Sequence, residues 1–286
     1  MRVRTRAVVA SGVVLAVVAV LGIWFVARQV GQMRVTFAGR SCTVQADGQV
    51  GLDSQQMANA ATIAAIGAQR GMPERAVVIA LATAYQESSL RNLTGGDRDS
   101  VGLFQQRPSQ GWGTPTEIQD PRYAARRFYA ALKKVRGWEE MRVTDAAQAV
   151  QRSAFPEAYE KWAGDSEVLT RALLGEATGA VSCTTGTEPV MRGQAAAAAL
   201  TEGLNLDWGL PGTESPADLT GLAVPAGDER DGWRYAHWLV AHANDHGVKR
   251  VRFAGLEWTA KQGGWKTVDD GGDAAGRVLA EVFGDV

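Results

Sequence analysis

The sequence predicts a mainly α-helical domain, preceded by one transmembrane helix and followed by a small α/β module. Three observations lead to this fold class. Residues 7–27 carry no charged side chain. Between residues 53 and 180 the apolar residues favour helices, because no long stretch alternates with the two-residue period of a strand. Residues 248–258 do alternate, around a glycine turn, as short strands would.

The N-terminus is predicted to anchor the chain in a membrane. An uncharged stretch of this length, at about 1.5 Å per residue, spans a hydrocarbon core of about 30 Å. Its end lacks the small-x-small pattern of a signal-peptide cleavage site. Three arginines in residues 1–6 favour a cytoplasmic N-terminus, with the bulk of the chain extracytoplasmic. We expect a signal anchor over residues 1–28 and a stalk over 29–51; a long cleaved signal peptide is the alternative.

The two cysteines and the net charge indicate the redox environment of the chain and the class of partner it can bind. Cys42 precedes the predicted helical domain and Cys183 follows it. Outside the cytoplasm a disulfide between them is expected, and it would join the entry of the domain to its exit; two free thiols are the alternative. The net charge of −1 lacks the basic excess of a nucleic-acid binder, so no nucleic-acid partner is expected.

The helical domain is expected over residues 52–183, and particular residues mark where its helices begin. Each predicted helix starts with a side chain that accepts hydrogen bonds from free backbone N–H groups, or with a proline, which has no N–H to satisfy. These starting residues are Asp53 or Ser54, Pro73, Thr114, Asp120 and Thr144. One more short helix is expected over residues 167–176.

The rest of the chain is predicted to be a linker and the small α/β module. Residues 184–228 are rich in Gly, Pro, Thr and Ser around one Ala-rich segment, residues 193–204, which we expect to be a helix. The module is expected over residues 229–286. Its predicted elements are a helix over residues 233–246, two short strands within residues 248–258 and a closing helix over residues 273–283.

Histidines and tryptophans of this region are assigned structural roles. His242 and His246 have the spacing of two metal ligands on a helix, but no third ligand follows in the strands. We therefore expect a polar helix face, with no metal and no cofactor. Five tryptophans are expected to form a core, with a binding surface as the alternative: Trp208, Trp233, Trp238, Trp258 and Trp265.

The stretch from Tyr85 to Arg107 carries the predicted chemistry. It follows a helix that has no ionisable side chain over residues 76–86 other than the phenol of Tyr85, so this helix should be buried on most sides. Glu87 comes next. Loss of water on one side of a carboxyl group favours the protonated form, which suits a general acid. A solvated carboxylate at a helix end is the alternative for Glu87.

Three motifs around Glu87 carry a family resemblance. They are E-S-S-L at residues 87–90, G-D-R at residues 96–98 and G-L-F-Q at residues 102–105. Together they resemble the lysozyme-like domain of soluble lytic transglycosylases and goose-type lysozymes, over about residues 52–175. In that family a catalytic Glu followed by Ser ends a buried helix, and a later G-L-M-Q type turn lines the sugar cleft. Phe104 replaces the usual Met as the expected cleft wall.

A further family motif is eroded in this chain. The family has a helix that reads roughly A-x-A-Y-N-A-G, and the counterpart here has Val150, Gln151 and Ser153 in place of Tyr, Asn and Gly. Tyr159 is expected to supply the lost phenol. The run over residues 102–113 looks like a lysozyme-like subgroup found in cell-surface proteins of high-GC Gram-positive bacteria.

The resemblance implies cleavage of the β-1,4 bond between N-acetylmuramic acid and N-acetylglucosamine in peptidoglycan. Glu87 is the expected general acid and then base. Goose-type lysozymes place a second acidic residue where this chain has Arg107, so we expect the substrate's own acetamido group to assist. A 1,6-anhydro product and hydrolysis both stay open. The expected substrate-binding residues are Ser88, Asp97, Gly102, Phe104, Gln105, Gln151 and Tyr159.

Several alternatives remain from the sequence. The eroded motif favours a catalytically inactive wall-binding or scaffold protein with the same fold. Gln105 either binds substrate or holds its turn as a buried amide. The C-terminal module faintly resembles a degenerate relative of zinc D-Ala-D-Ala peptidases without their zinc ligands. The expected partners are peptidoglycan glycan strands, and the membrane through the N-terminal helix. Three tryptophans either stack on sugars or belong to the core: Trp112, Trp138 and Trp162.

Overall fold

A computed structural model gives the fold of residues 41–153, 155–186, 188–210, 212–216, 219–268 and 276–285. These residues belong to one compact unit. No helix within them is long and apolar enough to cross a membrane. The predicted transmembrane signal anchor over residues 7–27, and the single-pass membrane location that depends on it, fall outside the described residues.

A three-stranded antiparallel sheet corrects the prediction of a mainly α first domain. Strand β1 (Ser41–Gln45) pairs with β2 (Gln49–Asp53) on one side and with β3 (Val181–Thr184) on the other. The end of the predicted stalk is therefore a β-hairpin. It forms because alternate residues turn inward, so that Val44 and Leu52 are buried in the core.

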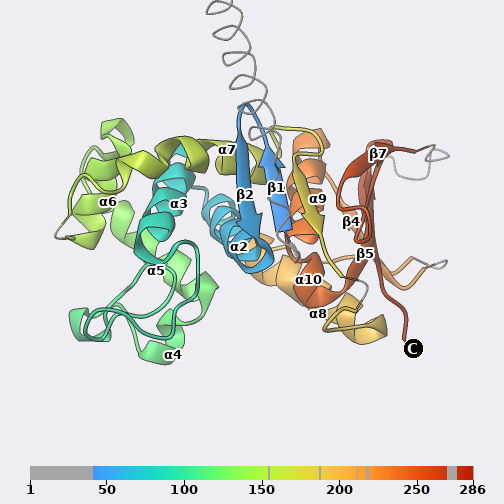
Figure 1. Ribbon diagram of the computed structural model, residues 1–286, viewed down its shortest axis with the longest axis horizontal. Helices are drawn as coiled ribbons and strands as arrows, with labels where there is room; N and C mark the ends of the chain where they lie inside the picture. Colours follow the sequence, from blue (N-terminus) through green and yellow to red (C-terminus); the bar gives the residue numbers. More distant parts are fainter. Residues whose placement is uncertain are drawn as a thin grey trace, which may run out of the picture. The chain divides into compact units, whose positions relative to one another are not determined.

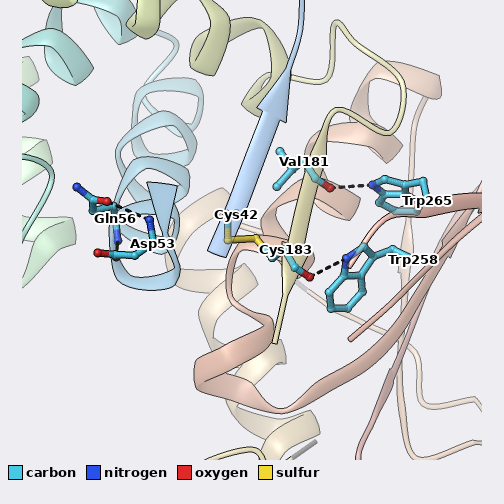
Figure 2. Close-up of a disulfide and its surroundings, with 7 residues drawn as sticks. All are labelled: Cys42, Asp53, Gln56, Val181, Cys183, Trp258 and Trp265. Carbon is cyan, nitrogen blue, oxygen red and sulfur yellow. Dashed lines mark hydrogen bonds between the residues drawn. A yellow bond between two sulfur atoms is a disulfide. The ribbon is translucent and has the colours of Figure 1, made fainter. Parts of the chain in front are cut away.

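The disulfide between Cys42 and Cys183 is confirmed. The two residues lie directly opposite each other on β1 and β3, with 4.0 Å between their Cα atoms. Figure 2 shows that β3 is also bound from its other side by two indole groups: Trp258 Nε1 donates to the Cys183 carbonyl over 3.2 Å, and Trp265 Nε1 to the Val181 carbonyl over 2.8 Å. Strand β3 thus links the disulfide to the C-terminal part of the chain.

Helix α2 (Ser54–Gln69) lies at the centre of the fold, against α3, α5, α7, α8 and α9 (Figure 1). It begins where predicted, since Asp53 and Gln56 form a reciprocal capping box. Around it are α3 (Glu74–Ser88), α4 (Pro115–Ile118), α5 (Pro121–Leu132), α6 (Val143–Gln151) and α7 (Ala163–Leu173). Short 3-10 helices cover Pro108–Gln110, Trp138–Glu140 and Glu160–Trp162.

The C-terminal part contains a second antiparallel sheet with the strand order β4-β8-β5-β6-β7. Helix α9 (Glu229–Ala241) packs against β4, β5 and β8 of this sheet and against β3 of the first, so it lies between the two sheets (Figure 1). The other elements are α8 (Gly193–Trp208), α10 (Ala243–His246), β4 (Gly221–Pro225), β5 (Val248–Phe253), β6 (Leu256–Thr259), β7 (Trp265–Thr267) and β8 (Arg277–Val282).

The predicted closing helix over residues 273–283 is wrong, because its described part is strand β8. Val278, Ala280 and Val282 are buried on alternate positions, while the residues between them are partly exposed. Strand β8 pairs with β4 and β5 at once, and these two rows of backbone hydrogen bonds outweigh the helical propensity of its Leu and Glu. The two strands predicted within residues 248–258 are confirmed as β5 and β6.

Helix α8, predicted within a linker, is fixed to the rest of the fold by one buried carboxylate. The Asp207 side chain is fully buried and accepts hydrogen bonds from Thr62 Oγ1 at 3.1 Å and Trp238 Nε1 at 2.8 Å. It also pairs with Arg122. These partners lie on α2, α9 and α5, so a single charged group joins four helices.

Candidate functional site

Helix α3 carries Glu87 from the protein core to the surface. Every residue from Ala76 to Tyr85 is buried, as the uncharged sequence predicted. Ser89 ends the helix in a left-handed conformation with φ of 53°. Glu87 therefore lies in the last helical turn, where it is half-buried.

The G-L-F-Q turn is fastened to this end of α3. Ser88 Oγ donates a hydrogen bond to the Leu103 carbonyl at 2.7 Å. Gly102 has φ of 78°, and a Cβ atom at this position would lie 2.7 Å from the Ile118 carbonyl oxygen, so only glycine fits here. The two motifs that the sequence separates by a polar loop are therefore in direct contact.

Phe104 is a core residue. Its side chain has no exposed surface and stacks on Phe128 with ring centroids 4.7 Å apart. Its backbone carbonyl accepts a hydrogen bond from Gln151 Nε2 at 2.7 Å. The Phe104 side chain thus anchors the turn in the core, and its carbonyl orients the Gln151 amide. The expectation that the Phe104 ring forms the cleft wall is wrong.

Tyr159 reaches Glu87 from the segment that follows α6. Its hydroxyl donates to Glu87 Oε1 at 2.7 Å. The Tyr159 side chain is buried, and this burial, followed by the hydrogen bond and the charge of Glu87, raises the pKa of its phenol above the usual value of 10.0. Tyr159 therefore remains a hydrogen-bond donor throughout the neutral range and holds one carboxyl oxygen of Glu87.

A polar pocket of about 440 Å³ opens beside Glu87. Its wall combines the end of α3, the loop after it, the G-L-F-Q turn and the end of α6. The lining residues are Glu87, Asp97, Arg98, Ser100, Gln105, Gln106, Arg107, Gln110, Trp112, Gln151, Arg152, Ser153 and Phe155. The structure thus places three of the predicted substrate-binding residues, Asp97, Gln105 and Gln151, in one pocket with Glu87.

Comparison with known proteins adds no identity. No family model matches the chain, and no curated protein matches it significantly.

The second carboxylate of the pocket is paired with an arginine. Asp97 Oδ2 accepts from Arg107 at 2.7 Å, while Arg107 Nε donates to Ser100 Oγ at 3.0 Å. The Asp97 side chain is 77% exposed, so both water and the cation screen its charge. The Asp99 carboxylate instead accepts a hydrogen bond from the backbone N–H of Ser109 at 2.8 Å, and this bond lowers the pKa of its carboxyl group.

Gln105 supports the turn and also lines the pocket. Its Nε2 donates to the Gly102 carbonyl at 3.1 Å, and its Oε1 lies where a Cβ atom on Gly96 would be only 1.7 Å away. A larger residue at position 96 would therefore displace the Gln105 side chain. The G-D-R motif and the G-L-F-Q motif are thus packed together at the pocket wall.

The tryptophans divide between the core and the pocket. Trp138 is buried, and Trp112 lines the pocket. Trp162 stacks on Tyr85 with centroids 4.7 Å apart and donates to Gln86 Oε1 at 3.1 Å, so it supports the end of α3. In the C-terminal part, Trp233, Trp238 and Trp258 are fully buried core residues.

Sequence reasoning missed three pocket residues that follow α6: Arg152, Ser153 and Phe155. Arg152 ends this helix in a left-handed conformation with φ of 53°, a conformation usually taken by glycine or asparagine. Phe155 is 73% exposed at the pocket wall. The sequence offered no positive indication of these residues, because the family motif that covers part of this stretch is eroded and no other local pattern predicts a pocket.

His242 and His246 stack on each other with ring centroids 5.9 Å apart, and His242 is buried, so the expected polar helix face is wrong at this position. His242 stacks on Trp238 with centroids 4.1 Å apart, and its Nε2 lies 4.0 Å from Asp207. Burial lowers the pKa of His242 well below its usual value and also lowers that of His246. In the part of the chain that the structure describes, no group of three or more His, Cys, Asp or Glu side chains is arranged to hold a metal ion.

Proposed function

We propose that this protein cleaves the β-1,4 bond between N-acetylmuramic acid and N-acetylglucosamine in peptidoglycan, with Glu87 as the catalytic acid and base. The observation that carries the proposal is the hydrogen bond from Tyr159 to Glu87 Oε1 at the wall of an open polar pocket. No described residue forms a hydrogen bond with Oε2, so this oxygen is available to a substrate. The motifs around Glu87, with their resemblance to lysozyme-like domains, support the same reaction.

The first step is protonation of the leaving group. Protonated Glu87 transfers its proton from Oε2 to the glycosidic oxygen as the bond from that oxygen to C1 breaks. The carbonyl oxygen of the substrate's 2-acetamido group bonds to C1 and stabilises the cationic centre. The carboxylate that remains stays oriented by the Tyr159 hydroxyl.

The second step uses Glu87 as a base. Its carboxylate accepts a proton from either the sugar's 6-hydroxyl or a water molecule as that oxygen attacks C1 and displaces the acetamido oxygen. The 6-hydroxyl gives a 1,6-anhydro product, and water gives hydrolysis. Asp97 is not assigned as nucleophile, because it is exposed and already paired with Arg107.

The polar wall supports a sugar substrate. Amide side chains of Gln105 and Gln151 at the pocket match the donors and acceptors of N-acetyl groups. The volume of about 440 Å³ lies within the usual range of small-molecule sites. The disulfide is expected of an oxidising compartment outside the cytoplasm, where peptidoglycan is found.

The direct test is lysis of purified peptidoglycan by the wild-type protein and by Glu87→Gln. Replacing the acid with an amide removes the transferable proton, so we expect the rate to fall by about 10²- to 10⁴-fold. Glu139→Gln makes the same chemical change at an exposed position outside the pocket and should lyse normally. Mass spectrometry of the products separates transglycosylation from hydrolysis.

Two outcomes would contradict the proposal. If Glu87→Gln lyses peptidoglycan as fast as wild type, Glu87 is not the acid. If the wild-type protein binds glycan strands without cleaving them, the inactive wall-binding alternative is correct.

A further inference from the structure

A second pocket continues the groove away from Glu87. It has a volume of about 690 Å³ and lies over the C-terminal half of α5 and the end of α6. It shares four lining residues with the Glu87 pocket: Gln110, Trp112, Gln151 and Arg152. A bound molecule can therefore extend from one pocket into the other without leaving the surface.

The second pocket is cationic. Arg127, Lys134 and Arg152 line it, and no acidic side chain is found among the described residues of its wall. This local excess contrasts with the chain's net charge of −1. The pocket therefore favours an anionic ligand, whereas the Glu87 pocket contains charges of both signs.

Two of these cations are available for a ligand. The side chains of Lys134 and Arg152 are exposed and form no ion pair with any described residue. Arg127 is partly engaged, because it donates to the Gly111 carbonyl at 2.7 Å and so fixes the loop between the pockets. Arg152 lies on the boundary, since it lines both pockets.

We propose that this cationic pocket binds the free carboxylates of the peptide stems on a peptidoglycan strand, while the glycan backbone lies at Glu87. The inference rests on the proposed function and names the form of substrate that the groove prefers. Guanidinium and ammonium groups bind carboxylates by charge-assisted hydrogen bonds. The sugar rings are uncharged, whereas the stem peptides carry carboxylates at a distance from the ring. A separate pocket beside the catalytic one suits that distance.

Binding is measured with Glu87→Gln, so that no ligand is consumed. Three ligands separate the possible sources of negative charge. Glycan fragments with stem peptides carry peptide carboxylates; fragments stripped by an amidase keep only the lactyl carboxylate; chitooligosaccharides are neutral. Lys134→Gln and Arg152→Gln are tested singly and together. Lys133→Gln is the matched control, because this residue is exposed on the same helix end but outside the pocket.

We expect each single variant to weaken binding of the peptide-bearing fragments by about two- to five-fold, and the double variant by about ten-fold. Chitooligosaccharide binding should stay unchanged in Lys134→Gln, because Lys134 lines only the second pocket, and all binding should stay unchanged in Lys133→Gln. Added salt should strongly weaken the binding of the peptide-bearing fragments and have little effect on the binding of chitooligosaccharides. Since both side chains are exposed, the melting temperature of each variant should equal that of the parent protein.

Other results would overturn the inference. Equal weakening on peptide-bearing and stripped fragments would assign the pocket to the lactyl carboxylate. Equal affinity for all three ligands, or an effect of Lys133→Gln as large as the others, would remove any specific role for the pocket. The proposed function fails separately. If the wild-type protein shows the expected binding pattern but does not cleave the glycan, the cationic pocket belongs to a non-catalytic binding protein.

Discussion

The Tyr159→Phe substitution tests how Glu87 is held. It removes only the hydroxyl that donates to Glu87 Oε1 at 2.7 Å. A hydrogen bond to a charged group contributes about 1.5–3 kcal/mol. Because Glu87 is only half-buried, water can replace part of this contact, and we take the lower half of the range. At about 1.4 kcal/mol per factor of ten, kcat should fall roughly 10- to 40-fold.

Stability should respond differently from activity. Phenylalanine leaves no buried donor without a partner, and Glu87 can be hydrated, so the free energy of unfolding should change by less than about 1 kcal/mol. Tyr129→Phe is the control. Its hydroxyl donates to the Ile63 carbonyl at 2.9 Å inside the core, so its removal should lower stability by about 1 kcal/mol without changing kcat.

The assay is initial-rate lysis of purified peptidoglycan across a range of pH, together with urea unfolding of each variant. Burial raises the pKa of both phenols, so neither should titrate within the pH range of the assay. A Tyr159→Phe protein with kcat within two-fold of wild type would refute the orienting role of this hydroxyl. Equal losses of kcat in both variants would indicate a general packing effect.

Three further predictions concern stability, and all are measured by urea unfolding. Reduction of the Cys42–Cys183 disulfide, which closes a loop across a sequence separation of 141, should lower the free energy of unfolding by roughly 5 kcal/mol, and no change would contradict its constraining role. Arg122→Met should cost roughly 3 kcal/mol because it leaves buried Asp207 unpaired, and adding Asp207→Asn should restore part of that loss; a neutral effect of Arg122→Met would sink the argument. Burial lowers the pKa of His237 to about 4 from 6.5, so below pH 6.5 the unfolded chain takes up a proton that the folded protein refuses. Stability should fall by about 3 kcal/mol as the pH falls from 6.5 to 4, and a His237→Gln variant with the same slope would refute this assignment.

Features that depend on neighbouring residues were predictable. The Asp53 cap of α2 and the Thr114 capping box of α4 both form as the sequence indicated, because each needs only residues three positions apart. The buried α3 followed from the absence of charge, and it brings Glu87 to the surface at its end. The Ser88 contact with the G-L-F-Q turn shows why the two motifs occur together.

Features that depend on residues far apart in the sequence were not predictable from the sequence. Strand β8 carries residues suited to a helix, and only its pairing with β4 and β5 makes it a strand. Helix α8 was predicted as part of a linker, because nothing near Asp207 in the sequence reveals its partners on three other helices. Sequence periodicity describes a single element, whereas both outcomes depend on where other elements lie.

The sequence by itself determined the buried helix before Glu87, the G-L-F-Q turn after it and the two cysteines that pair. Each follows from composition and short-range spacing. Only the tertiary structure decided that Tyr159 holds the Glu87 carboxyl group from 72 positions away and that Arg152 lines two adjoining pockets. The physical reason is that a pocket forms where several elements meet, and their meeting is fixed by packing of the whole core around α2.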